Sequence, residues 1–94
     1  MHALVVRVTI HDADATRKVL NGQVVPQLSA APGFKVGYWT WSTGGGEMNG
    51  LSMVIYDSED NARSAGDRLR EIGAAAPDSV TVDSVEVREV VASA

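Results

Sequence analysis

The segment Thr9–Ala15 (TIHDADA) returns 45 positions later as Val54–Asp60 (VIYDSED). In each copy an apolar run ends at a ring-bearing side chain, an Asp follows, and a helical pattern begins. An internal repeat of this kind indicates two strand–helix–strand halves. The repeat therefore predicts the split βαβ arrangement, with elements in the order βαββαβ.

Alternating and helical patterns place the individual elements around the repeat. Period-two alternation predicts strands over residues 4–11, 34–42, 51–56 and 80–91. Apolar residues at helical spacing predict one helix that begins at Asp12 and ends before Pro32, and a second capped by Asp57 or Ser58. We expect residues 1–94 to form one α+β domain. Its fold should be a ferredoxin-like βαββαβ sandwich, with a four-stranded antiparallel sheet and two helices on one face.

Local irregularities are expected at two places. The ring of Pro26 would collide with the carbonyl group of Gly22, so the first helix should kink or restart there. In the last strand the apolar residues change parity at Asp83 and Ser84, which predicts a bulge or a bend.

Composition excludes several classes of function. The 94 residues include no cysteine, so the chain can form neither a disulfide nor a site built on a thiol. A net charge of −4 disfavours binding to a nucleic-acid backbone. No apolar run approaches the roughly 20 residues of a membrane span, and the N-terminal residues do not resemble a signal peptide. We therefore expect a cytoplasmic protein without nucleic-acid or membrane partners.

The two faces of the expected sheet differ in character. One face is apolar and should carry the helices: Val6, Val8, Ile10, Phe34, Val36, Tyr38, Leu51, Met53, Ile55, Val85 and Val87. The other face is mixed: Arg7, Thr9, His11, Trp39, Trp41, Ser52, Val54, Tyr56, Glu86 and Arg88. Because an exposed aromatic patch usually marks an interface, we expect a two-fold homodimer formed through the mixed face.

Three segments carry a resemblance to a known family. Val24–Phe34 (VVPQLSAAPGF), followed by Gly37–Trp39 (GYW) and Met53–Glu59 (MVIYDSE), resembles the dimeric α+β barrel superfamily, which includes the antibiotic-biosynthesis-monooxygenase-like domains. The resemblance implies a homodimer whose sheets form a barrel. Some members are cofactor-free monooxygenases of aromatic polyketides, and others degrade haem. The haem-degrading members use a Trp on the third strand and a His on the second helix. This sequence has no Trp on its expected third strand and no His on its expected second helix.

Five residues of the mixed face are candidates for ligand binding. His11 and Tyr56 are equivalent in the repeat, and on adjacent parallel strands their rings would be neighbours that could bind an anion or assist proton transfer. Trp39 and Trp41 could stack on a planar aromatic ligand, and Arg7 shares their face. The alternative for all these aromatic residues is packing in a dimer interface.

Other motifs have simpler interpretations. The loop Gly44–Gly46 lacks the Lys-Ser/Thr ending of a phosphate-binding loop and joins two strands. Asn49–Tyr56 lacks the basic residue and two of the aromatic residues of an RNA-recognition motif. The acidic residues at the end of each repeat copy are helix caps and partners of the helix dipole, so no metal site is predicted: Asp12, Asp14, Asp57, Glu59 and Asp60.

Two hypotheses for function remain. The first is a small homodimeric protein of unassigned activity that binds a hydrophobic or aromatic small molecule. The second, suggested by the resemblance, is a cofactor-independent monooxygenase acting on an aromatic substrate. The spacing of the residues reveals no catalytic set, and neither hypothesis requires a cofactor.

Overall fold

The computed structural model describes residues 1–43 and 48–94 and has the predicted βαββαβ order. The elements are β1 (His2–Ile10), α1 (Ala13–Val19), η1 (Leu20–Val24), α2 (Val25–Ser29), β2 (Phe34–Trp41), β3 (Asn49–Tyr56), α3 (Glu59–Ala74) and β4 (Val80–Glu89). Each strand begins and ends within two residues of its predicted bounds. The expected loop at Gly44–Gly46 lies outside the described residues.

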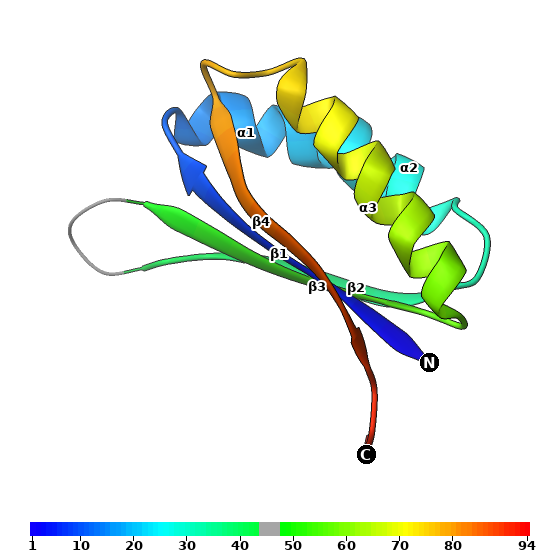
Figure 1. Ribbon diagram of the computed structural model, residues 1–94. Helices are drawn as coiled ribbons and strands as arrows, with labels where there is room; N and C mark the ends of the chain where they lie inside the picture. The colour runs from blue at the N-terminus through cyan, green and yellow to red at the C-terminus, as the bar shows by residue number, and fades with distance from the viewer. Residues whose placement is uncertain (44–47) are drawn as a thin grey trace.

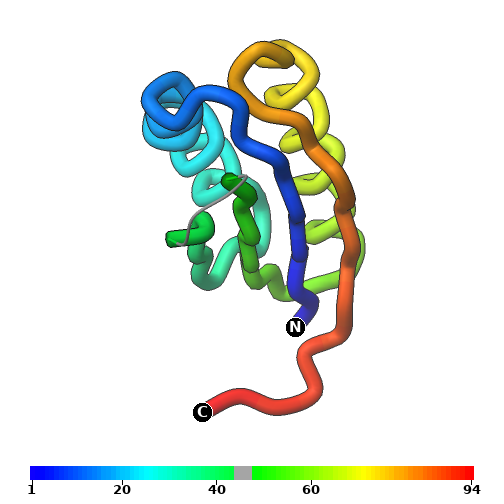
Figure 2. The backbone as a smooth tube through the Cα atoms, turned by 90° about the vertical axis from the view of Figure 1, so that its left-hand side faces the viewer, coloured from blue at the N-terminus to red at the C-terminus, as the bar shows by residue number. Residues whose placement is uncertain are grey.

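The strands form one sheet in the order β2-β3-β1-β4, with every neighbouring pair antiparallel. Elements α1, η1 and α2 form one helical segment over residues 13–29, here called the first helical segment, and it lies with α3 on the same face of the sheet (Figures 1 and 2). This arrangement confirms the ferredoxin-like α+β sandwich. No helix in the described part of the chain has both the length and the apolar character needed to cross a membrane.

Both copies of the repeat begin a helix as predicted. Asp12 is the N-cap of α1, and its Oδ1 accepts a hydrogen bond of 3.0 Å from the amide of Ala15. Ser58 is the N-cap of α3 and accepts a bond of 3.2 Å from the amide of Asn61. Such side-chain acceptors satisfy amides that have no partner within the helix.

The expected interruption at Pro26 is confirmed. The chain passes from α1 into a turn of π-helix over Leu20–Val24 and continues as α2, which has Pro26 in its first turn. Proline is tolerated in a first turn because its missing N–H would have no helical partner there. The π-turn therefore separates two short α-helices within one helical segment.

The predicted bulge in β4 is also present. Arg7 pairs with Ser84, whereas the next residue, Val8, pairs with Val82, so Asp83 is the extra residue. An extra residue reverses the parity of the side chains that follow. Val82 and Val85 consequently both pack against the core beneath the helices.

The predicted assignment of sheet faces is wrong for most of β2 and for β3. Phe34 pairs with Tyr56, but Val36 pairs with Ile55, so a register shift at Lys35 reverses the parity of the rest of β2. In β3, Ser52 pairs with Val6, and residues directly opposite one another point to the same face. The helix-covered face therefore carries Trp39, Trp41, Ser52, Val54 and Tyr56, whereas the uncovered face carries Val36, Tyr38, Leu51 and Met53.

Small residues allow α3 to lie close to the sheet. The predicted stripe of Ala62, Ala65, Gly66, Leu69 and Ile72 is buried. A Cβ atom on Gly66 would lie 3.1 Å from side-chain atoms of both Leu4 and Val85. The stripe therefore faces the core as predicted, and its side chains leave little space between α3 and the sheet.

Candidate functional site

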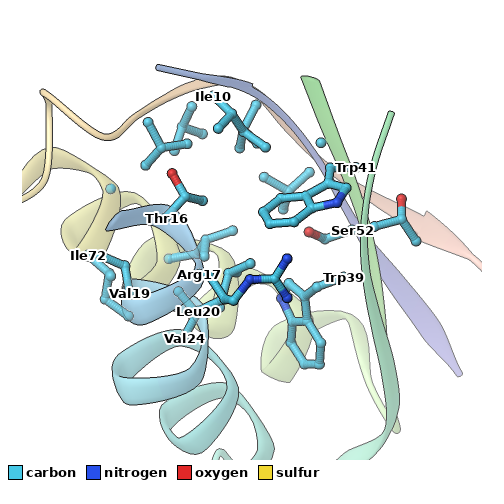
Figure 3. A pocket seen from close by; sticks show the side chains of 18 residues that line it. Ile10, Thr16, Arg17, Val19, Leu20, Val24, Trp39, Trp41, Ser52 and Ile72 are labelled. Atoms are coloured by element: carbon cyan, nitrogen blue, oxygen red, sulfur yellow. The ribbon is translucent and has the colours of Figure 1, made fainter. Parts of the chain in front are cut away.

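A cavity of about 360 Å³ lies between the first helical segment and the sheet (Figure 3). We call it the indole cavity, because Trp39 and Trp41 form part of its wall. Most of the remaining wall is aliphatic and includes Val6, Val8, Ile10, Leu20, Val24, Leu69, Ile72 and Val82. A concave apolar site with a few polar groups is the usual form of a small-molecule pocket.

The two indoles belong to alternate residues of β2. Trp39 and Trp41 therefore point to the same face of the sheet, towards the first helical segment. Gly37 makes room for the first of them, because a Cβ at residue 37 would lie 2.7 Å from Cη2 of Trp39. The Nε1 atom of Trp39 is buried and has no hydrogen-bond partner among the described residues.

Arg17 extends from α1 towards both indoles (Figure 3). Its Cζ atom lies 4.6 Å from the centroid of the Trp41 ring. A cation over an indole face gains about 0.5–1 kcal/mol at an exposed site. The ion pairs within residues 1–43 and 48–94 use Arg63, Arg68 and Arg88, and none uses Arg17.

The other polar groups of the wall are hydroxyls. Thr16 donates a hydrogen bond of 3.0 Å to the carbonyl oxygen of Ser79, and Thr40 donates one of 2.6 Å to that of Leu51. Ser52 is a buried polar residue on β3. Among the described residues, no Asp, Glu, His or Lys lines the cavity. The described wall thus offers hydrogen-bond donors and one guanidinium, but no carboxylate or imidazole to act as a base.

The structure separates His11 from Tyr56. Strand β1 pairs antiparallel with β3, so Tyr56 lies opposite His2. The expectation of adjacent parallel strands is wrong, because β3 returns as a hairpin from β2 and lies between two strands that run the same way. His11 is exposed, with its Nε2 atom 2.7 Å from Oγ1 of Thr81.

Tyr56 is a core residue with 0% of its surface exposed. Its hydroxyl donates a hydrogen bond of 2.8 Å to the carbonyl oxygen of Leu28, and its ring meets that of Phe34 edge to face at 6.0 Å. Burial raises the pKa of Tyr56 from 10.0 to about 12. The hydrogen bond to Leu28 connects the sheet to α2.

Arg7 is exposed on the uncovered face, between Leu51 and Ser84 on the neighbouring strands. Of the five candidate residues, the indole cavity therefore brings together Trp39 and Trp41 alone. Sequence reasoning missed Arg17. Arg17 precedes Leu20 by three residues and Val24 by seven, which is the helical spacing of the buried stripe. This spacing could have predicted that Arg17 lies on the side of the helix that faces the sheet.

Comparisons with known proteins show the fold alone. No protein-family model matches the chain, and the search of curated proteins gave no significant match. SnoaB, a cofactor-independent oxygenase from Streptomyces nogalater, superposes with a TM-score of 0.73 at 16% identity, covering 98% of this chain and 94% of SnoaB. Rv0793 from Mycobacterium tuberculosis gives 0.68 at 19% identity, covering 100% and 99%. HapK from Hahella chejuensis gives 0.67 at 10% identity, covering 100% and 96%.

Proposed function

We propose that this protein binds a planar aromatic small molecule in the indole cavity. The observation that carries the proposal is the pair of indoles, Trp39 and Trp41, on the wall of an otherwise mainly aliphatic cavity of about 360 Å³. Aromatic faces favour offset stacking or edge-to-face contact with another aromatic ring. Aliphatic walls favour a ligand that has few polar atoms of its own.

The position of the cavity also supports binding. Val24, Leu69 and Ile72 line the cavity and belong to the buried core, so the cavity opens directly against that core. A cavity of this size admits water, and its apolar wall atoms would gain hydrophobic and dispersion contacts if a ligand replaced that water. A hydrophobic ligand would supply those contacts without a rearrangement of the sheet.

We further propose that a second copy of the chain covers the open face, which is the uncovered sheet face that carries Val36, Tyr38, Leu51 and Met53. Their exposed fractions are 40%, 66%, 39% and 46%, respectively. A contiguous apolar patch of this kind usually marks an interface. The expected homodimer of the dimeric α+β barrel family is therefore retained as a proposal, with these residues replacing the two tryptophans at the interface.

A cofactor-independent oxygenase acting on an aromatic substrate is the second candidate. Its support is the fold shared with SnoaB, together with a cavity lined by aromatic residues. The described lining residues include no carboxylate or imidazole, which favours binding over proton abstraction. Oxygen uptake with a hydroxylated anthracene would distinguish the two candidates. An oxygenase requires uptake above the rate without protein, and a binding protein does not.

Calorimetric titration with 2-naphthamide, a neutral two-ring amide, tests the binding proposal. We expect saturable binding that Trp39→Leu weakens and that Tyr38→Leu leaves unchanged. Tyr38 is a matched control, because it is the adjacent residue of the same strand and points to the opposite face. Equal loss of affinity in both variants, or failure of both this amide and the matching acid, 2-naphthoate, to bind the natural sequence, would contradict the proposal.

A further inference from the structure

We infer that the ligand of the indole cavity is an aromatic carboxylate, with its charged end at Arg17 and its ring against the two indoles. This inference rests on the proposed function and adds the chemical class of the ligand. It is carried by the charge and the hydrogen-bonding groups of the cavity wall.

The first observation is the unbalanced charge of Arg17. It is the one charged residue among the described residues that line the cavity, although acidic residues outnumber basic ones in the chain by 12 to 8. Within the described part of the chain, its guanidinium contacts the Trp41 ring and forms no ion pair. The N–H groups of Arg17 therefore have no described carboxylate to bind.

The second observation is the buried Nε1–H group of Trp39, a donor without an acceptor among the described residues. A buried donor that lacks a partner is energetically unfavourable, so an acceptor on a ligand would satisfy it. Because Gly37 has no side chain, the indole of Trp39 can lie along the strand next to it. Figure 3 shows the guanidinium of Arg17 and this indole both on the cavity wall, so the cavity carries two kinds of donor.

A carboxylate matches these donors better than a neutral group does. Arginine has five N–H donors in a planar fork and binds a carboxylate through two parallel hydrogen bonds. A neutral amide would present only one oxygen acceptor, and a cationic ligand would be repelled. Because the rest of the wall is mainly aliphatic, the remainder of the ligand should be an uncharged ring system.

The test compares 2-naphthoate with 2-naphthamide, which share a ring system and a nearly equal shape but differ in charge. We expect titration calorimetry at pH 7.5 to show roughly tenfold or greater preference for the carboxylate. Arg17→Gln should remove that preference while the amide still binds. Lys18→Gln is the matched control, since it removes the same charge from an exposed neighbour that does not line the cavity, and it should retain the preference.

Spectra of ¹⁵N-labelled protein supply a second measurement. The chain has two tryptophans, so each indole N–H gives a resolvable signal. The Trp39 signal should shift further with the carboxylate than with the amide. Equal affinity for the two probes, or an Arg17→Gln variant that keeps the preference, would overturn the inference and leave the proposed function standing. Failure of both probes to bind would overturn the proposed function itself and the inference with it.

Discussion

Replacing Tyr56 with Phe should destabilise the protein by about 1 kcal/mol. The substitution keeps the ring and its edge-to-face contact with Phe34, and it removes only the hydroxyl that donates to Leu28 at 2.8 Å. The carbonyl of Leu28 also accepts a hydrogen bond of 3.3 Å from the backbone amide of Ala31, so it does not lose its only partner. The loss should therefore be that of one net hydrogen bond, about 0.5–1.5 kcal/mol, without the penalty of an unsatisfied buried group.

Urea unfolding monitored by circular dichroism measures this difference, with both proteins at one concentration because dimerisation would contribute to stability. A loss of 1 kcal/mol corresponds to about 4–8 °C in the melting temperature of a domain this small. A loss near zero would mean that the hydroxyl makes no bond in the folded protein. A loss above about 3 kcal/mol would mean that Leu28 is left without a partner.

The pH dependence gives an independent measurement of the same residue. The pKa of Tyr56 is higher in the folded protein, about 12, than its ordinary value of 10.0. Its contribution is therefore complete below pH 10 and is lost as the pH rises towards 12, by up to about 1.4 kcal/mol per pH unit. The stability advantage over Tyr56→Phe should shrink across this window. A constant difference between pH 9 and 11.5 would refute the raised pKa.

Three further substitutions test the fold and the assembly. Leu69→Ala should lower the free energy of unfolding in urea by about 2–5 kcal/mol, because Leu69 lies on the buried face of α3 and is only 8% exposed. A loss below about 1 kcal/mol would place this side chain outside the core. Met53→Glu should shift a dimer towards monomer in light scattering, because it introduces a charge into the open face. The control Ser64→Glu, on the exposed side of α3, should leave the mass unchanged. An unchanged mass for Met53→Glu would show that the open face is not the interface. Asp12→Ala should lower stability by about 1 kcal/mol through loss of the bond to the amide of Ala15, and no loss would show that Asp12 does not stabilise the start of α1.

Local chemistry made much of the fold predictable from the sequence. Asp12 and Ser58 can satisfy helix amides wherever a helix begins, and Pro26 cannot continue an ordinary helix. The bulge at Asp83 follows from the change of parity between neighbouring valines. Each of these features depends on a few adjacent residues, so a single sequence contains the necessary information.

The assignment of faces in β2 and β3 could not be predicted in the same way. Both strands carry large apolar side chains on each parity, such as Tyr38 beside Trp39 and Met53 beside Val54. Alternation alone therefore favours neither set. The choice depends on pairing across strands and on the register shift at Lys35. No change of parity comparable to that in β4 marks this shift in the sequence.

Only some of the residues that line the indole cavity could be identified from the sequence, because the others depend on the tertiary structure. Aromatic character alone identified Trp39 and Trp41 as possible stacking residues, and the structure places both on one cavity wall. The pairing of His11 with Tyr56 failed because it required parallel strands. Arg17 was missed because a charged residue on a short helix normally points to solvent, and its contact with Trp41 depends on the tertiary structure.

The position of a bound aromatic ligand tests the central proposal most directly. Nuclear Overhauser effects between 2-naphthoate and methyl-labelled protein would report which side chains lie within about 5 Å of its ring. We predict contacts to Ile72 and Val24 and to the indole protons of Trp39, all of which line the indole cavity. Contacts to Met53 and Tyr38 instead would place the ligand on the open face and contradict the proposal.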